Sequence, residues 1–465
     1  MKVFLFIVHK CYTFATSLTK PKPFVPLMFS IDVFKFGGAS VRDAAALRNV
    51  FEVLSAYKDQ RLLVVFSAMG KTTNDLEQIA QTAFEGYEDE SISHFGRIKQ
   101  YHLDVIEGLD VSKIACDAIG FEVEKLFDEL KNKIFDVDKN IPFNQYYDQI
   151  VCFGELISTQ IVSAYLNAMR LTNTLLDARQ YIKTDNSFRD ARVQWKPTQE
   201  RIETLKRAFE ASKLPKIYVV QGFLGSTEPN MSTTLGREGS DYSASIFAHC
   251  LDAQSLTIWK DVAGVMSADP KLFANATKID ALSYDEAVEL TYYGASVIHP
   301  KTIQPLKIKS IPLFVKSFIK PTDEGTKISD GDKKIDLPCI IFKKNQLLID
   351  FKAQDLTFFA EDSMAIVFQT LSELSIKAHF TENCGRYFSI CIDNDAFKVK
   401  PFVEKLSKQF DLELTPNLEL INIRHYNQTI IDELTQQKTI YNENRTAETA
   451  QFLVGAWTGK RYELY

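Results

Sequence analysis

Cysteine is scarce and without pattern in this chain of 465 residues. The seven cysteines form no Cys-x-x-Cys pair, and the seven histidines form no His-Glu-x-x-His motif. Zinc sites and thiol redox centres depend on such spacings, so no transition-metal site is predicted. We expect buried, reduced thiols, as in a cytoplasmic protein.

The chain also lacks a basic run and a long apolar run. Its 54 Lys and Arg against 60 Asp and Glu give a net charge of -6, and nucleic acid is not an expected partner. No later apolar stretch approaches the roughly 20 residues of a membrane span, so no membrane association is expected. With 45% apolar and 25% charged residues, the composition predicts a folded protein of about two to four domains.

The first 27 residues differ from the rest. The apolar run at 3–8 weakly resembles a secretion signal, but His9 and Lys10 end it. Prolines at positions 21, 23 and 26 then exclude a helix. We expect residues 1–27 to be an extension without function, with Met28 as an alternative start, and we expect the protein to be cytoplasmic.

From residue 31 onward, short apolar runs alternate with segments of helical spacing, such as 47–54, 76–84 and 157–166. Nearly continuous apolar strands indicate burial on both faces, so this alternation predicts an α/β fold with a mainly parallel sheet covered by helices. The predicted strands are 33–36, 62–66, 150–153, 217–220, 256–259 and 312–315. Helix starts are predicted where a capping residue precedes a carboxylate by three positions, at Ser40 with Asp43, Asn74 with Glu77 and Ser283 with Glu286.

A polar stretch at 321–336 predicts a linker between domains. After it, short strands flank single helices, and this unit occurs twice. We therefore predict a larger α/β domain at 28–320 and two small α+β modules at 337–465. The module elements are expected at 346–351, 364–374 and 387–392, and again at 418–424, 430–437 and 450–454.

The first segment with chemical features is 33–41. It places Lys35 in an apolar strand that ends in Gly37 and Gly38. Paired glycines at a strand-to-helix turn let backbone N–H groups approach a phosphate, and the lysine adds a point charge. A tight turn with a lysine that reaches solvent is the structural alternative.

The segment 64–75 resembles the end of a P-loop, because Gly, Lys and Thr occupy positions 70–72. The full pattern needs glycine at position 65, where Val65 stands within the strand, so a P-loop is excluded. Small and hydroxyl residues after a strand remain suited to a polar ligand at the carboxyl edge of a sheet.

Two further segments carry charge next to expected helix starts. Glu155 follows the predicted strand 150–153, where the helix dipole alone would favour it, and binding of a substrate ammonium group is the functional alternative. Arg237 lies in a loop dense in Gly, Ser and Asp and is shaped for bidentate contact with a carboxylate or phosphate. The N–H of Ser240, at the following helix start, can also bind an anion.

Taken in order, the motifs KFGGAS, SAMGKTTN, GELIS, TTLGREGSDYSA, WKDVAGVMSADP and GASVIHP closely resemble those of the aspartate kinases (aspartokinases) of the amino-acid kinase family. The resemblance implies a three-layer sandwich around a mainly parallel sheet, followed by two ferredoxin-like ACT modules. It implies transfer of the γ-phosphoryl group of ATP to the side-chain carboxylate of L-aspartate, the first step toward lysine, methionine and threonine. It also implies Mg²⁺ carried by ATP, a homodimer, and an amino-acid effector such as lysine or threonine at the ACT modules.

The resemblance assigns roles to individual residues. Lys35 and Asp241 are the implied catalytic residues, with Lys35 on the transferring phosphoryl group and Asp241 ordering the phosphate and metal site. A carboxylate is already ionised at neutral pH, so the transfer needs positioning and charge neutralisation rather than a general base. The implied aspartate-binding residues are Thr73, Glu155 on the ammonium group, Arg237 on the α-carboxylate, and Ser240. The implied ATP-binding residues are Lys35, Gly37, Gly38, Lys260, Asp261, Met266, Lys271, Ser296 and Val297.

Several positions depart from the family's usual residues, and most of them concern the nucleotide contacts. In the first module, residues 360–364 lack the glycine that often lets this loop surround an effector, so the effector stays open. The departing residues are Ala39, Glu238, Met266, Lys271 and Ser296, in place of a hydroxyl residue, glycine, tyrosine, arginine and lysine, respectively.

Three other functions fit parts of the pattern. A kinase of glutamate, acetylglutamate or UMP would share the fold, but the motif set with two C-terminal modules separates the chain from these. A catalytically inactive amino-acid sensor is disfavoured by the joint presence of Lys35, Glu155, Arg237 and Asp241. A bifunctional kinase with a dehydrogenase would need a Gly-x-Gly-x-x-Gly unit, which this sequence does not contain.

Overall fold

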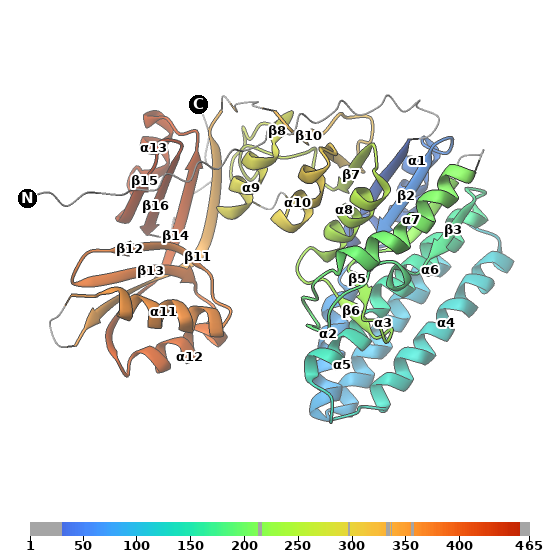
Figure 1. Cartoon of the computed structure of the whole chain (residues 1–465), viewed down its shortest axis with the longest axis horizontal. Helices are drawn as coiled ribbons and strands as arrows, with labels where there is room; N and C mark the ends of the chain where they lie inside the picture. The colour runs from blue at the N-terminus through green and yellow to red at the C-terminus, as the bar shows by residue number, and fades with distance from the viewer. Residues whose placement is uncertain are drawn as a thin grey trace, which may run out of the picture.

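The computed structural model describes residues 30–212, 216–295, 298–331, 335, 337–354 and 358–455. Two large β-sheets organise them, an eight-stranded sheet from the first part of the chain and a six-stranded sheet from residues 339–455 (Figure 1). The extension expected at residues 1–27 lies outside the described residues.

The eight-stranded sheet is mainly parallel, as predicted. Its strands are β1 (Ile31–Phe36), β2 (Arg61–Phe66), β3 (Asn173–Leu176), β4 (Lys216–Gln221), β7 (Ser255–Lys260), β8 (Ala281–Ser283), β9 (Leu313–Ser317) and β10 (Thr326–Ser329), and β5 (Leu224–Ser226) and β6 (Ser232–Thr234) form a separate hairpin. The strand order is β3-β4-β2-β1-β7-β9-β10-β8, and only the pair β9–β10 is antiparallel. The predicted strands in β1, β2, β4, β7 and β9 are confirmed.

Helices directly follow β1, β2, β3 and β8, in agreement with the predicted alternation of strands and helices. The segments of helical spacing at 47–54, 76–84 and 157–166 lie in α1, α2 and α6. The bounds are α1 (Ala44–Ser55), α2 (Thr72–Glu85), α3 (Glu88–Glu107), α4 (Lys113–Phe135), α5 (Phe143–Val151), α6 (Phe153–Ala168), α7 (Trp195–Ala211), α8 (Gly239–Leu251), α9 (Tyr284–Tyr292) and α10 (Pro300–Ile308).

The side chains of β1 alternate between two helix-covered faces of the sheet. Lys35 points to one face, where it contacts Asp241 of α8. Phe34 points to the other face, where its ring contacts Tyr57, just after α1. Adjacent residues of a strand face opposite sides, so helices lie on both faces, and the predicted three-layer sandwich is confirmed.

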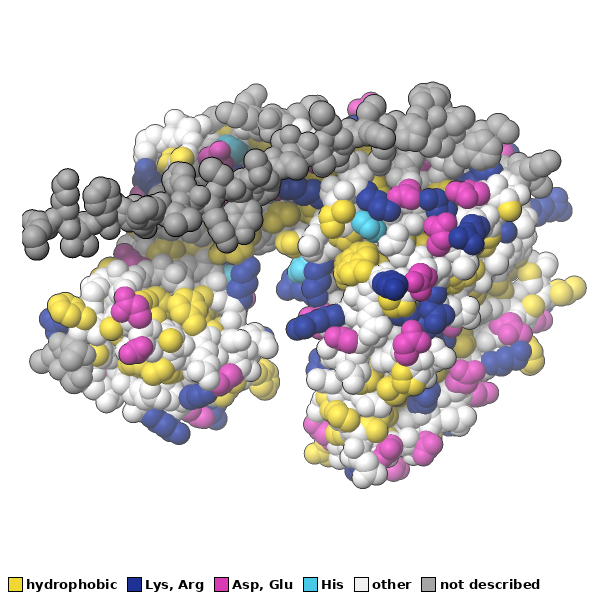
Figure 2. Space-filling model, viewed as in Figure 1, with side chains coloured by type: hydrophobic (Ala, Val, Ile, Leu, Met, Phe, Trp, Pro, Cys, Tyr) yellow, Lys and Arg dark blue, Asp and Glu magenta, His cyan; other side chains and the backbone are white. Residues whose placement is uncertain are grey.

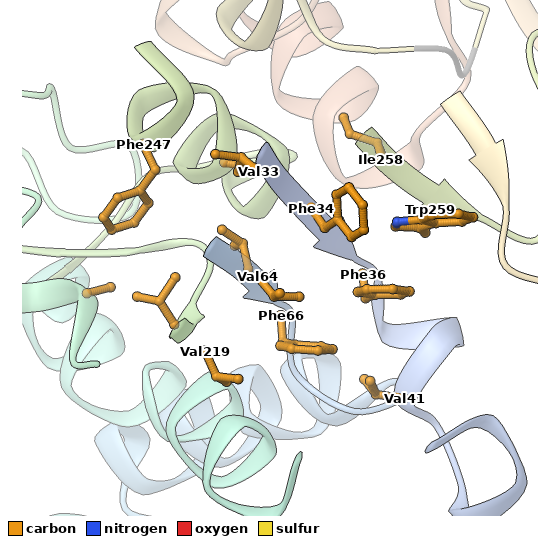
Figure 3. Close-up of a cluster of buried hydrophobic side chains, with 14 of the residues drawn as sticks. Val33, Phe34, Phe36, Val41, Val64, Phe66, Val219, Phe247, Ile258 and Trp259 are labelled. Atoms are coloured by element: carbon orange, nitrogen blue, oxygen red, sulfur yellow. The ribbon is translucent and has the colours of Figure 1, made fainter. Parts of the chain in front are cut away.

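An aromatic stack crosses the centre of the sheet on the Phe34 face. The ring of Phe36 stacks on Phe66 of β2, with centroids 5.3 Å apart, and on Trp259 of β7, with centroids 5.9 Å apart (Figure 3). All three side chains are buried. Stacked rings add to the free energy of burial, so the stack fixes the three strands whose carboxyl ends form the edge described below.

One predicted strand is wrong. Residues 150–153 span the junction of two helices, because α5 ends at Val151, Cys152 forms a turn, and α6 begins at Phe153. A short apolar run does not distinguish a buried strand from a buried helix, and here both helices are covered on most sides. The span Phe143–Ala168 is apolar enough to cross a membrane by length and composition, but 78% of its most apolar window is buried inside the protein. We interpret it as a core element.

The three predicted helix starts have different outcomes. Ser283 caps α9 and accepts the N–H of Glu286, as expected. At α1 the capping residue is Asp43 rather than Ser40, because residues 38–41 form a separate short 3-10 helix. Helix α2 already begins at Thr72, before the expected cap Asn74.

The six-stranded sheet is antiparallel. Its strands are β11 (Cys339–Ala353), β12 (Ala378–Asn383), β13 (Tyr387–Asp393), β14 (Phe410–Arg424), β15 (Ile440–Arg445) and β16 (Thr449–Gly455), in the order β12-β13-β11-β14-β16-β15, with helices α11 (Glu361–Glu373), α12 (Ala396–Leu406) and α13 (Gln428–Thr435). The two predicted α+β units are present, but β11 and β14 run through both, so they share one continuous sheet. The polar stretch predicted as a linker contributes β10 to the eight-stranded sheet.

The two sheets meet through α9. Arg424, at the end of β14, donates through Nε and Nη2 to the two carboxylate oxygens of Glu286, at 2.7 and 2.8 Å. His425 Nε2 lies 3.1 Å from the same carboxylate. Asn422 Nδ2 donates to the carbonyl of Tyr293, just after α9, at 3.0 Å. Away from this interlobe contact, Figure 2 shows a hollow between two lobes, bordered by Lys and Arg side chains.

Candidate active site

Lys35 lies near the carboxyl end of β1 with little exposure to solvent. Its Nζ is 2.5 Å from Oδ1 of Asp241, in the first turn of α8, and the two side chains are 11% and 5% exposed. The alternative of a lysine that reaches solvent is therefore not what the structure shows. Burying an ion pair costs desolvation free energy. This pair lies near the carboxyl ends of the parallel strands, where ligands of α/β folds bind.

The glycines after β1 allow two loops to touch at this edge. A Cβ at Gly38 would lie 2.8 Å from the carbonyl oxygen of Ala68 and 2.9 Å from that of Gly70. A Cβ at Gly37 would lie 3.5 Å from Lys35 Nζ. The glycine pair therefore brings the backbone after β1 against both the loop after β2 and the lysine ammonium group.

Glu155 contributes an incompletely bonded carboxylate to the same edge. It lies in the first turn of α6, and its Oε1 accepts the N–H of Ala68 at 3.2 Å. Its Oε2 is buried and has no hydrogen-bond partner among the described residues. Burial raises the pKa of Glu155 to about 8, against the opposing effects of the Ala68 N–H and the charge of Lys35. A cationic ligand group would supply the missing partner.

The turn before α8 carries Arg237 and is unusually tight. Gly236 has φ 77° and Glu238 has φ 54°, so both adopt the left-handed region, where a glycine is favoured and a glutamate is strained. The carboxylate of Glu238 accepts the N–H of His299 at 2.9 Å. The departure from glycine at position 238 therefore adds a contact between this turn and the segment before α10.

Glu155, Arg237 and Glu238 line one cleft of about 470 Å³, whereas Lys35 and Asp241 are not among its lining residues. The cleft brings together five residues that the sequence predicted, namely Gly38, Thr73, Glu155, Arg237 and Ser240. It also contains Glu77, Tyr147, Arg189 and Phe223, which sequence reasoning missed. None of these four lies in a motif rich in glycine and charge, so no local signal marked them.

The remaining predicted nucleotide residues lie in a second cavity of about 590 Å³. Lys260, Asp261, Met266 and Lys271 line it, and residues 339–342 of β11 form another part of its wall. Ser296 and Val297 lie outside the described residues, although Gly294 and Ala295 line the cavity. Lys260 is the last residue of β7, which pairs with β1, the strand of Lys35, so the two cavities lie at the ends of neighbouring strands.

Comparison with known proteins agrees with this geometry. The sequence model of the amino acid kinase family matches residues 31–317. The chain belongs to this family. Aspartokinase 3, chloroplastic, of Arabidopsis thaliana is 30% identical over 400 residues, which cover 84% of this chain and 70% of that protein, so the chain lies among the aspartokinases.

Other aspartokinase relatives differ in length from the chain. Aspartokinase 2, chloroplastic, of Arabidopsis thaliana is 33% identical over 369 residues, covering 78% of this chain and 66% of that protein. The chain therefore spans slightly less than two thirds of that relative's length. Lysine-sensitive aspartokinase 3 of Escherichia coli is 28% identical, covering 75% of this chain and 78% of that protein.

The solved structure of E. coli aspartokinase III in complex with aspartate and ADP has the same fold. It superimposes with a TM-score of 0.75 at 25% identity and covers 91% of this chain and 96% of that one. Its T-state structure with lysine and aspartate gives a TM-score of 0.76 at 24% identity, with the same coverage. The predicted aspartokinase architecture, an amino-acid kinase fold followed by ACT modules, is confirmed.

Proposed function

We propose that the protein is an aspartate kinase, which transfers the γ-phosphoryl group of ATP to the side-chain carboxylate of L-aspartate and produces 4-phospho-L-aspartate. One observation carries the proposal. The buried Lys35–Asp241 ion pair lies near the carboxyl ends of the central strands, close to the incompletely bonded carboxylate of Glu155. Glu155 lines a cleft that Arg237 also lines. Charges of both signs fit a substrate that has two carboxylates and one ammonium group.

The transfer itself needs little from the protein beyond placement and charge. A carboxylate oxygen of aspartate forms a bond to the γ-phosphorus of ATP, and the bond from that phosphorus to the bridging oxygen of ADP breaks. The nucleophile is already ionised, so no general base is required. Lys35 stabilises the negative charge on the transferring group, and we assign the same role to the N–H groups of Gly37 and Gly38, because a Cβ at Gly37 would lie 3.5 Å from Lys35 Nζ.

Aspartate recognition uses the other charged groups of the cleft. The ammonium group pairs with Oε2 of Glu155, which supplies the hydrogen bonds that this buried oxygen lacks among the described residues. Arg237 holds the α-carboxylate, and Thr73 and Ser240 line the same cleft. The substrate is thereby positioned with its side-chain carboxylate toward Lys35.

ATP fits the second cavity with its phosphates toward the glycine turn. Lys260, Asp261, Met266 and Lys271 would contact the nucleotide there, with Ser296 and Val297 following from the motif alone. The described residues contain no group of three or more His, Cys, Asp or Glu side chains that could hold a metal ion. We propose a Mg²⁺ that would be carried by ATP near Asp241, where it would neutralise phosphoryl charge.

In this proposal, the C-terminal six-stranded sheet binds the regulatory effector. We assign the catalytic domain to residues 28–320 together with β10, which pairs in the same sheet, and the paired ACT modules to residues 337–465. A relative from E. coli is described as lysine-sensitive, and we assign an amino-acid effector, lysine or threonine, to these modules. A cytoplasmic homodimer completes the proposal.

The test is formation of acyl phosphate. Purified protein with Mg-ATP and L-aspartate is assayed by trapping the product with hydroxylamine, beside Lys35→Met and, as a matched control, Lys327→Met on β10. We expect hydroxamate from the wild type and the control, and a loss of about 10²- to 10³-fold in Lys35→Met at an unchanged circular dichroism spectrum. A folded wild type that forms no hydroxamate but binds lysine or threonine would favour the inactive sensor and overturn the proposal.

A further inference from the structure

Arg189 occupies a strained backbone position that the surrounding structure holds in place. Its φ is 64°, in the left-handed region that an arginine rarely adopts. Its N–H donates to both carboxylate oxygens of Asp148, at 3.1 and 3.0 Å. Asp148 is fully buried on α5 and also accepts the N–H and the hydroxyl of Thr234, at 2.9 and 2.8 Å. Strain that the structure maintains in this way is often found at functional sites.

The side chain of Arg189 is held at the cleft by an aromatic ring. Its guanidinium carbon lies 4.3 Å from the ring centroid of Tyr147, and both residues line the cleft that contains Glu155 and Arg237. The hydroxyl of Tyr147 donates to Glu77 of α2, which fixes the ring in turn. Stacking orients a guanidinium and leaves its N–H groups available for a planar anion.

The guanidinium of Arg189 contacts two aromatic rings of α5, those of Phe143 and Tyr147. Within the parts of the chain that the structure describes, its guanidinium forms no ion pair, whereas the next residue, Asp190, pairs with Lys301. An anion from outside the protein is the natural partner of a cation presented in this way.

We propose that Arg189 is a second substrate-binding arginine, which holds the non-reacting carboxylate of the amino-acid substrate together with Arg237. This inference rests on the proposed aspartate kinase function. Tyr147 connects Arg189 to Glu77, one helical turn farther from the strand edge than Thr73. Arg189 therefore binds the end of the substrate that lies away from Lys35, where the α-carboxylate is placed. Lys35 contacts the carboxylate that accepts the phosphoryl group.

The first test measures steady-state kinetics of Arg189→Gln and Arg189→Gly. Glycine suits the left-handed backbone and keeps the N–H that bonds to Asp148, so this variant removes only the side chain. We expect both variants to raise KM for aspartate about 10- to 100-fold, with kcat within about threefold and KM for ATP unchanged, because the contact exists equally before and during the transfer. Arg192→Gln, an exposed arginine of the same segment that does not line the cleft, is the control and should match the wild type.

A substrate analogue separates a direct contact from a structural effect. L-Aspartate α-amide keeps the ammonium group and the reacting carboxylate but lacks the α-carboxylate charge. If Arg189 binds that carboxylate, the ratio of kcat/KM for aspartate to that for the amide falls at least tenfold in Arg189→Gln relative to the wild type. An unchanged ratio in an active variant would overturn the role of Arg189 alone. A folded wild type that phosphorylates neither compound would overturn the proposed function and this inference with it.

Discussion

The pKa values of two largely shielded glutamates, one in the cleft and one in the interlobe contact, shift in opposite directions. Burial raises the pKa of Glu155 to about 8, and the hydrogen bond from Ala68 and the charge of Lys35 do not offset it. Burial acts in the same direction on Glu286, but the hydrogen bonds and charges of Arg424 and His425 outweigh it and leave its pKa lowered. Both side chains are largely shielded from water, so the opposite pKa shifts come from their partners: Glu286 has the cations Arg424 and His425 bonded to it, whereas Glu155 accepts the backbone N–H of Ala68.

The comparison distinguishes a carboxylate whose hydrogen bonds hold the fold together from a carboxylate that is available to bind a ligand. Both carboxylate oxygens of Glu286 are bonded to Arg424, and this bonded pair joins α9 to the C-terminal sheet. One carboxylate oxygen of Glu155 has no partner among the described residues. A saturated buried charge stabilises the fold, whereas an unsaturated one lowers stability and is retained where a substrate completes it.

We expect the largest effect on stability when Arg424, the cation of the interlobe contact, is removed. Arg424→Ala leaves the carboxylate of Glu286, only 12% exposed, without its cation, and we expect the free energy of unfolding to fall by about 3 to 5 kcal/mol in urea titrations. The control removes both charges, as Arg424→Met with Glu286→Leu, and should recover most of that loss. A loss below about 1 kcal/mol in the single variant would show that the pair contributes little to stability.

A second, smaller effect should appear at Glu155. The folded state keeps a proton on Glu155 between about pH 4.5, the ordinary value, and about pH 8, whereas the unfolded state releases it, so stability is lost as the pH rises through this range. Glu155→Gln removes this loss, and without substrate we expect it to be more stable than the wild type by on the order of 2 kcal/mol at pH 9.

Thermal unfolding at pH 5, 7 and 9 measures this difference. Glu286→Gln is the matched comparison and should be less stable than the wild type at every pH above 4.5, because the lowered pKa of Glu286 means that its ionised form stabilises the folded state. Parallel pH profiles of Glu155→Gln and the wild type would contradict the assignment of a raised pKa to Glu155.

The smallest expected effect concerns an exposed pair across β11 and β14. Lys352 Nζ lies 3.1 Å from Glu413, but the two side chains are 53% and 67% exposed, so solvent screens their attraction. Lys352→Ala should change the free energy of unfolding by about 0.5 kcal/mol or less, measured in the same urea titrations. A loss comparable to that of Arg424→Ala would show that exposure does not decide how much these ion pairs contribute.

Much of the sheet could be predicted from the sequence, because buried parallel strands leave a local signal. The apolar runs of β1 and β2 identified strands, and a lysine inside such a run was conspicuous. The same signal misled at residues 150–153, where a four-residue apolar run belongs to the ends of two buried helices. A run of apolar residues indicates that a segment is buried, but burial alone does not determine whether its backbone is a strand or a helix.

The missed part of the cleft depends on contacts between distant residues. Arg189 reaches the cleft because Asp148, 41 positions earlier in the chain, fixes its backbone. Tyr147 lies beside Asp148 on α5, a helix that the sequence did not predict. No spacing rule connects these residues, so their placement follows only from the folded structure.

The strands β11 and β14, which both C-terminal units share, also limit how this protein can be divided. A fragment that stopped after α12 would keep β11 but lose β14, its neighbour along almost its whole length. Such a fragment would expose a long row of unpaired backbone groups on an apolar strand, which is a template for aggregation. Recombinant production of the C-terminal units therefore requires a boundary that keeps both of them on one chain.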